Sequence, residues 1–400
     1  KVAALGWHIW APDAYAEAED DLTAMLSAIL SKAGIWGLLL LAVFMGAPLW
    51  HSLSLNTVLG WLGTLTAFFA TLYAIFQEDA KRLLAWSSIG QVGYIVMGVA
   101  MMSHLGWLAA LWHTLNHFLF KGLLFLAIAG VIHRTGTRNM YEMGGLIKRM
   151  PFTFFSVLIG IIALSGVPPL TGFGGKWLLY EALIEKGWYL QAGVAFFAST
   201  IAFLYCYRLI HAIFLGIPKP DQLQVREAPF RILFPQYILI AFIFVFSLKP
   251  AWLLKPLSAM VAPYFTPTLG WQGDTAVSSL GYWNGTVMMI LVVFIFALVL
   301  LNLLWMSRGS KKVKPFNIVY AAEKPDRPQT THYAWHFFAP YQRAMRPLLK
   351  PLIRHFWQGV GEWTATGGSV LRRIYNGNGQ SYAMLILLLA IILFALTAGA

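Results

Sequence analysis

The sequence contains little charge and a single cysteine. Charged residues make up 11% of its 400 residues, whereas a soluble globular domain carries roughly 25%. The lone cysteine, Cys206, excludes a disulfide framework and a cysteine-ligated metal site within the chain. In contrast, 58% of the residues are hydrophobic and 17 are Trp, which is typical of helices bordered by bilayer interfaces. This composition excludes a water-soluble enzyme, a disordered protein and a nucleic-acid binder.

Long apolar runs dominate the chain. A helix that crosses the hydrocarbon core needs about 20 apolar residues, and the runs found here lack the period-two alternation of a membrane strand. The sequence therefore predicts an all-α fold, a polytopic transmembrane helical bundle, with strands not expected. The predicted spans are 22–47, 55–77, 83–104, 105–132, 152–185, 188–216, 232–254, 283–306 and 382–400, preceded by an apolar stub at 1–10.

The net charge of +13 is distributed unevenly between alternate loops. If 152–185 crosses the membrane once, one set of loops contains 13 Lys and Arg residues and the other contains three. The positive-inside rule places the richer set in the cytoplasm of a multi-pass protein of the cell (inner) membrane. That set is Lys81, Arg82, Arg134, Arg138, Lys148, Arg149, Lys219, Arg226, Arg231, Arg308, Lys311, Lys312 and Lys314, and the other is Lys186, Lys249 and Lys255.

Three regions follow from these patterns. Residues 1–306 form a transmembrane bundle, and residues 381–400 form a C-terminal transmembrane helix. Between them, residues 307–380 mix basic, aromatic and aliphatic side chains without a full-length span, which is typical of an amphipathic segment lying along the cytoplasmic membrane face. A solvated linker is the alternative interpretation of 307–380.

One predicted span contains three titratable side chains in register. His113, His117 and Lys121 are spaced four residues apart, which stacks them on one face of a helix at about 6 Å per step. Such groups change protonation near neutral pH when suitably placed, so a row of them suits stepwise proton transfer. Packing of ordinary core residues is one alternative. A metal site is a weaker one, because no carboxylate shares the face and Lys121 repels a cation.

Lys32, Lys176 and Arg208 are further basic residues within predicted spans. Lys32 lies about ten residues into the first full span, where an ionisable group is expensive and suggests a function. Lys176 ends the stretch Ser165–Lys176, whose two prolines and four glycines predict a helix broken at mid-membrane, as in many transporters. The alternative for Lys32 is a lysine that is hydrogen-bonded to a neighbouring helix. The alternative for the break before Lys176 is a kink that only serves packing. Arg208 is expected to extend towards the cytoplasmic interface.

Several motifs together resemble the antiporter-like subunits of respiratory complex I, multisubunit (Mrp-type) Na⁺/H⁺ antiporters and membrane-bound hydrogenases. The similarity extends over nearly the whole chain, and its C-terminal end resembles most closely the membrane subunits of hydrogenase-4 and formate hydrogenlyase. It departs from the family at Ala11, where a leucine is usual, and at Glu19–Asp21, where a proline-containing turn is usual. The matching stretches are HIWAPDA at 8–14, KAGIWGL at 32–38, KRLLAWSSIGQVGY at 81–94, MGGL at 143–146 and VLRRIYNG at 370–377, with His113, His117, Lys121 and Lys176.

The resemblance implies a correspondence of helices. Residues 1–10 would be the second half of a broken helix 7, with Lys1 at the position of an essential lysine, and the full spans would be helices 8 to 16. The six preceding helices of the family are absent, so we expect the chain to begin inside a longer protein. The segment 307–380 would brace neighbouring subunits.

The resulting hypothesis is a proton-translocating membrane subunit of a redox-driven complex, similar to complex I or an energy-converting hydrogenase. Lys32 would hold a proton received from Lys1 or the cytoplasm, His113, His117 and Lys121 would relay it, and Lys176 would release it outside. No cofactor motif is visible, so iron–sulfur clusters, flavin or a [NiFe] centre are expected only in partner subunits. The alternatives are a non-conducting structural anchor and a subunit of a Na⁺/H⁺ antiporter.

Overall fold

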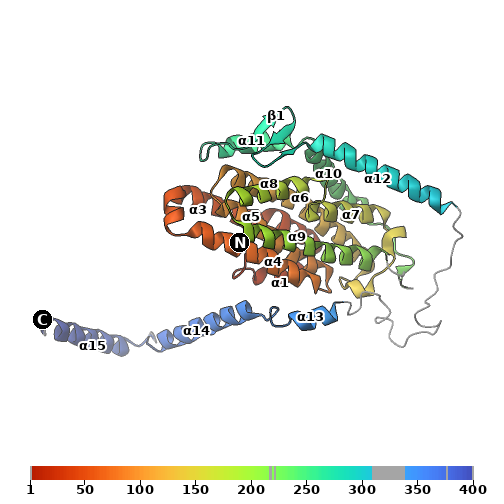
Figure 1. The fold of residues 1–400 in the computed structure, drawn as a ribbon. Helices are drawn as coiled ribbons and strands as arrows, with labels where there is room; N and C mark the ends of the chain where they lie inside the picture. Colours follow the sequence, from red (N-terminus) through yellow and green to blue (C-terminus); the bar gives the residue numbers. More distant parts are fainter. Residues whose placement is uncertain (1, 216–218, 220–221, 309–337, 375–376, 399–400) are drawn as a thin grey trace. The chain divides into compact units, whose positions relative to one another are not determined.

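The computed structural model describes residues 2–215, 219, 222–308, 338–374 and 377–398. It divides into two compact units, Lys1–Ala344 and Met345–Ala400. Both are built from helices, which confirms the predicted all-α class (Figure 1). The helices of the first unit are α1 (Trp10–Glu17), α2 (Asp20–Met25), α3 (Ser31–Ser52), α4 (Leu55–Ile75), α5 (Ala80–Ala100), α6 (His104–Thr135), α7 (Pro151–Ser165), α8 (Thr171–Glu185), α9 (Tyr189–Ile210), α10 (Phe230–Leu248), α11 (Ala251–Val261) and α12 (Gly285–Ser307).

Shorter helical turns join or extend these helices. A π-helix, η1 (Leu26–Leu30), makes α2 and α3 continuous, and a second one, η4 (His211–Leu215), extends α9. Two 3₁₀ turns, η2 (Met140–Glu142) and η3 (Leu146–Lys148), lie between α6 and α7. α13 (Ala339–Met345) crosses the boundary between the units.

Helix α5 lies at the centre of the first unit, and its glycines let neighbouring helices approach closely. Nearly all of its residues are buried. A Cβ atom placed on Gly93 would lie 2.5 Å from the backbone nitrogen of Ala67 in α4. The N-terminus of α5 is capped by Asp79, whose carboxylate accepts hydrogen bonds from the backbone N–H groups of Lys81 and Arg82. The polar face of α5 is therefore held rigidly inside the bundle.

The predicted break in 152–185 is confirmed. α7 ends at Ser165, Gly166 adopts a left-handed conformation with φ of 75°, and α8 begins at Thr171. Pro168 and Pro169 lie between the two helices, where no helical hydrogen bond is required of them. Figure 1 shows α7 and α8 following one another along the bundle. The four residues of the break, 166–169, are half-buried, and the flanking Ser165 and Leu170 are buried.

The other predicted spans agree with the structure apart from their ends and one exception. Eight helices of the described residues are long and apolar enough to cross a membrane, and the broken α7–α8 pair makes the ninth predicted span. The exception is 232–254. That segment forms α10 only to Leu248, after which Lys249 and Pro250 interrupt the helix and α11 begins.

The expectation that strands are absent is wrong for one short region. β1 (Gly270–Gln272), β2 (Thr275–Val277) and β3 (Tyr282–Trp283) form an antiparallel sheet in the order β1-β2-β3. Ala276 pairs with Trp271 on one side and with Trp283 on the other. These strands are two or three residues long and join hydrophilic turns, so they produce no periodic apolar signal.

The described residues of the second unit include two long helices. α14 (Leu352–Ile374) is amphipathic: Leu352, Phe356, Trp363 and Val370 share one face by their spacing, and its basic residues lie on others. α15 (Gly379–Ala398) is apolar on all sides, which agrees with the predicted C-terminal span. Residues 309–337 of the predicted lateral segment lie outside the described residues.

Candidate functional site

Helix α6 carries the predicted row of titratable side chains through the interior. His113, His117 and Lys121 are 3%, 0% and 0% exposed. α6 has 32 residues, and its N-cap Ser103 accepts a hydrogen bond from the backbone of Gly106. Because the three side chains share one helix face, they lie one above another along the core of the bundle.

Lys32 extends into this row from α3. Its Nζ atom lies 2.6 Å from Nδ1 of His117 and donates to the backbone carbonyl of Ser27 at 2.7 Å and to the hydroxyl of Ser31 at 3.0 Å. Ser27 belongs to the π-helix η1. π-helical turns often mark functional positions because they alter the direction of neighbouring side chains and carbonyls. The irregular turn therefore supplies one of the hydrogen-bond acceptors of the Lys32 amine.

The contact between Lys32 and His117 restricts their protonation. One of the two nitrogen atoms must donate and the other must accept, so the contact holds one proton. Two full positive charges at this separation would repel each other by about 6 kcal/mol at an effective dielectric constant of 20. The pair is therefore suited to exchanging a proton rather than to holding two.

The remaining side chains of the row are held by α5. Lys121 donates to the Leu84 carbonyl at 3.1 Å and also to the Ser87 hydroxyl, and Nε2 of His113 lies 2.9 Å from Oε1 of Gln91. Nδ1 of His113 and Nε2 of His117 have no hydrogen-bond partner among the described residues. Among the described residues, these are the two imidazole nitrogen atoms of the row that no protein group satisfies.

Lys176 lies beyond the break between α7 and α8. Its Nζ atom donates to the carbonyl of Ser165 at 2.6 Å and to the hydroxyl of Ser199 at 2.5 Å. It also lies 5.5 Å from the ring centroid of Tyr94, and that ring lies 5.9 Å from the ring of His113. Tyr94 thus links the row on α6 to Lys176.

Gly175 in α8 allows α8 to pack closely against α6. A Cβ atom on Gly175 would lie 3.1 Å from Nδ1 of His113 and 3.0 Å from the ring of Trp112, so a larger residue would press on the row. The break therefore does two things. It orients the Ser165 carbonyl towards Lys176, and it brings α8 close to α6.

The structure brings together five of the six predicted site residues: Lys32, His113, His117, Lys121 and Lys176. Lys1 lies outside the described residues. The supporting side chains Ser87, Gln91 and Tyr94 were not predicted, although their spacing of three or four residues in an otherwise apolar span is a usable signal. The partners Ser165 and Ser199 come from other helices and leave no such signal.

Arg208 extends towards the end of α9, as expected, but it bonds to protein groups there and is not solvated. Its side chain is buried, donates to the carbonyl of Ile75 and, at 2.8 Å, to the hydroxyl of Tyr141, and lies 5.8 Å from the ring of Phe338. It therefore joins α9 to the end of α4 and to the segment after α6.

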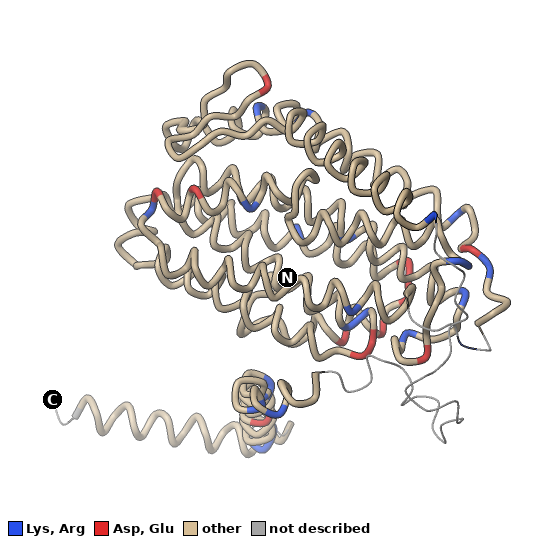
Figure 2. The backbone as a smooth tube through the Cα atoms, turned by 45° about the vertical axis from the view of Figure 1, so that its right-hand side comes forward, with Lys and Arg blue, Asp and Glu red and all other residues tan. Residues whose placement is uncertain are grey.

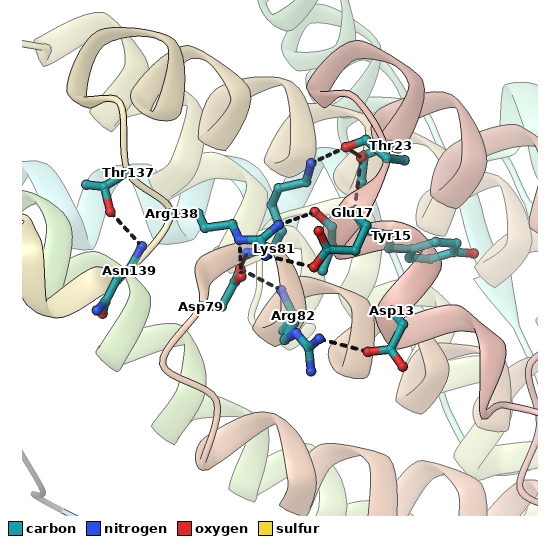
Figure 3. A network of polar contacts seen from close by, with 12 residues as sticks. Asp13, Tyr15, Glu17, Thr23, Asp79, Lys81, Arg82, Thr137, Arg138 and Asn139 are labelled. Carbon is teal, nitrogen blue, oxygen red and sulfur yellow. Dashed lines mark hydrogen bonds and ion pairs between the residues drawn. The ribbon is translucent and has the colours of Figure 1, made fainter. Parts of the chain in front are cut away.

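A second polar network lies at one end of the bundle (Figure 3). Lys81 pairs with Asp20 at 2.8 Å and Arg82 pairs with Asp13 at 2.8 Å. Arg138 pairs with Glu17 at 2.8 Å and with Asp79 at 2.7 Å. The acidic stretch at Glu19–Asp21, which departs from the family pattern, thus supplies a partner for the buried Lys81 amine.

These ion pairs alter the pKa of surface groups. The hydrogen bond and charge of Arg138 lower the pKa of the Glu17 carboxyl, and Glu17 raises the pKa of Arg138. In the segment around the small sheet, the hydrogen bond and charge of Lys249 lower the pKa of Asp274. The Glu17 and Asp274 carboxyls therefore stay charged at neutral pH. Among the described residues, no group of three or more His, Cys, Asp or Glu side chains is placed to hold a metal ion.

Comparison with known proteins gives three relevant similarities. The sequence profile of the family described as NADH:quinone oxidoreductase/Mrp antiporter, TM, matches residues 1–202. Hydrogenase-4 component B of Escherichia coli (strain K12) is 34% identical over 295 residues, covering 67% of this chain and 43% of that protein. A Na(+)/H(+) antiporter subunit of Alkalihalophilus pseudofirmus (strain ATCC BAA-2126 / JCM 17055 / OF4) is 32% identical over 313 residues, covering 71% of this chain and 38% of that protein.

A solved structure agrees over almost the whole chain. It is a chain of the membrane-bound sulfane sulfur reductase (MBS), an archaeal respiratory membrane complex, with a TM-score of 0.87 and 31% identity. The match covers 98% of this chain and 66% of that one. The chain spans less than half the length of the two curated relatives.

Proposed function

We propose a function from one premise: the chain belongs to the NADH:quinone oxidoreductase/Mrp antiporter family of transmembrane subunits. It is a multi-pass membrane protein. Its function, in this proposal, is to translocate protons as a membrane subunit of a redox-driven complex. The observation that carries the proposal is the 2.6 Å contact between Lys32 and His117, two titratable side chains from different helices in the interior of the bundle.

The proposed path uses the residues in spatial order. A proton arriving from the end of the bundle that holds the ion pairs, or from Lys1, binds at Lys32 and passes to His117. Lys121 lies one helical turn from His117 and stores a second proton. His113 receives the transferred proton and passes it, beside Tyr94, to Lys176. Water at the unpartnered nitrogen atoms of His113 and His117 would complete the hydrogen-bonded route.

Electrostatic repulsion couples the protonation of each site on the path to that of its neighbours. Two unit charges 4–7 Å apart interact by roughly 2–4 kcal/mol at an effective dielectric constant of 20. A proton that arrives at one site therefore lowers the affinity of its neighbour by a factor of ten or more, since about 1.4 kcal/mol is a tenfold change. Charging of Lys32 by a conformational change in a neighbouring membrane subunit would push protons onwards towards Lys176.

The same proposal assigns location and partners. The basic loops and residues 307–380 lie on the cytoplasmic side of the cell (inner) membrane, and 307–380 brace neighbouring membrane subunits. Figure 2 supports one part of this: most charged residues of the first unit gather towards one end of the bundle. Iron–sulfur clusters, flavin or a [NiFe] centre belong to peripheral partner subunits.

Sodium transport is the second candidate, because one relative belongs to a Na(+)/H(+) antiporter. A hard cation such as Na⁺ prefers oxygen ligands. The charged groups of the proposed path are basic, so its chemistry favours H⁺. Pumping that requires Na⁺ at fixed pH would support the antiporter instead.

Substitution of Lys32 tests the proposed function. In inside-out vesicles that contain the assembled complex, Lys32→Ala should lower redox-driven proton uptake at least about tenfold, because a positioned proton carrier typically contributes such factors. Uptake is measured with a pH-sensitive dye and electron transfer is measured in parallel. The matched control is Lys148→Ala, at an exposed lysine outside the path. Normal proton uptake in Lys32→Ala vesicles would favour a structural anchor.

A further inference from the structure

The final turns of α8 contain two carboxylates beyond Lys176. Glu181 and Glu185 follow it by five and nine residues. With a rise of 1.5 Å and a rotation of 100° per residue, they lie roughly 7.5 and 13.5 Å further along the helix axis, and Glu181 points about 140° around that axis from Lys176, towards Gly281. The next helix, α9, runs from this end of the bundle back to the charged end, where Arg208 bonds Ile75 and Tyr141. Glu181 and Glu185 therefore lie between Lys176 and the end of the bundle opposite the ion-pair network.

The two glutamates differ in their surroundings. Glu181 is 5% exposed, and its Oε2 atom has no hydrogen-bond partner among the described residues. Glu185 is exposed and accepts a hydrogen bond from the Ser279 hydroxyl. A buried carboxylate oxygen without a partner is expensive to retain unless it serves a function. Tyr180, whose hydroxyl is also buried and unpartnered among the described residues, lies one turn beyond Lys176.

The small sheet region covers Glu181. A Cβ atom on Gly281 would lie 3.4 Å from Oε1 of Glu181, so the turn Ser278–Gly281 lies directly against the carboxylate. Trp283, in β3, packs on α8, where a Cβ atom on Gly174 would lie 2.1 Å from its ring. Figure 1 shows the sheet lying over α8. In these contacts, the segment that lies over the Glu181 carboxylate is the short turn Ser278–Gly281.

We propose that Glu181 is the last buried proton acceptor of the path, between Lys176 and the aqueous phase at this end. The inference rests on the proposed function. The Lys176 ammonium loses its proton and becomes a neutral amine, while the Glu181 carboxylate gains that proton through water. The O–H bond of Glu181 then breaks, the proton passes to bulk water as hydronium, and the carboxylate is restored. The neutral amine of Lys176 is ready to accept the next proton from His113.

The test compares isosteric substitutions in vesicles of the assembled complex. Glu181→Gln should lower redox-driven proton translocation by about tenfold or more, because the amide keeps the shape of the side chain but accepts no proton. Glu181→Asp should restore much of the rate, since the carboxylate returns. Glu185→Gln is the matched control: it makes the same change one turn later at an exposed position, and its rate should equal that of the parent. Assembly of each variant is checked on native gels.

The outcomes separate the inference from its premise. Slow translocation in Glu181→Gln with rescue by Glu181→Asp supports the inference. A parental rate in Glu181→Gln together with a lost rate in Lys32→Ala overturns the role of Glu181 and leaves proton translocation intact. Parental rates in both variants overturn the proposed function. Equal slowing by Glu181→Gln and Glu181→Asp in correctly assembled complex would show a packing role and would also overturn the inference.

Discussion

At the scale of single residues, the broken helix depends on one backbone contact. A Cβ atom on Gly172, in the first turn of α8, would lie 1.7 Å from the carbonyl oxygen of Ala163 in α7. Backbone cannot rotate away as a side chain can, so Gly172→Ala should force α7 and α8 apart. Overpacking of this kind costs typically about 1–3 kcal/mol or more. We expect Gly172→Ala to lower the amount of folded protein in membranes and to displace Lys176 from the Ser165 carbonyl.

The control for this prediction is Gly37→Ala. Gly37 lies in α3, and a Cβ atom placed on it would meet nothing within 4 Å, so alanine there should be neutral or slightly stabilising. Thermal inactivation of the detergent-extracted protein measures both variants. Equal stability of Gly172→Ala and Gly37→Ala would contradict the close approach of the two helices.

The residues of the path show what spacing can predict. The four-residue period of His113, His117 and Lys121 predicted one buried face, because a helix fixes that geometry within a single element. The contact of Lys32 with His117 joins residues 85 positions apart. Its geometry depends on how two helices pack, which no local pattern contains. The same holds for Lys176 and Ser199.

At the scale of elements, Asp79 combines two roles at the start of α5. Its carboxylate caps the helix by accepting from Lys81 N–H at 2.8 Å and Arg82 N–H at 3.1 Å, and it also pairs with Arg138 at 2.7 Å. Asp79→Ala removes both, and the lost cap alone costs about 1 kcal/mol. Asp79→Asn keeps an equivalent cap and loses only the charge. The resistance to unfolding should therefore fall in the order Asp79, Asp79→Asn, Asp79→Ala.

Unfolding of the purified protein by a denaturing detergent gives this order directly. Arg82→Gln provides a comparison, because its half-exposed pair with Asp13 should contribute less than about 1 kcal/mol. If Asp79→Asn were as unstable as Asp79→Ala, the ion pair with Arg138 would outweigh the cap.

The elements differ in how far sequence predicts them. The break after Ser165 was predictable because two prolines and several glycines cannot continue a helix in the membrane interior. The π-helix η1 has an ordinary apolar sequence that gives no local signal for an irregular turn. The sheet at Gly270–Trp283 was missed because its strands are too short for periodicity, although Trp283 fixes its position on α8.

At the scale of the whole molecule, the distribution of Lys and Arg predicted which loops lie at the same end of the bundle. The structure places Lys81 and Arg82 in one network with Arg138 at one end, although Arg138 belongs to a different loop of the sequence. The predicted sidedness concerns the membrane, however, and a folded bundle has the same contacts in either orientation. Only labelling from a known side decides it.

The single buried cysteine makes that labelling simple. Cys206 is 4% exposed, so the parent protein should react little with a membrane-impermeant maleimide. Lys148→Cys, at an exposed position between α6 and α7, should be labelled in inside-out vesicles and protected in right-side-out vesicles. Tyr282→Cys, at a position 78% exposed in β3, should show the reverse. Because α7 and α8 connect these two sides as one broken crossing, opposite labelling also tests the assumption on which the charge count depends. Labelling of both cysteines from the same side would require two crossings by 152–185, and the proposed path from Lys32 to Lys176 would then begin and end on one face of the membrane.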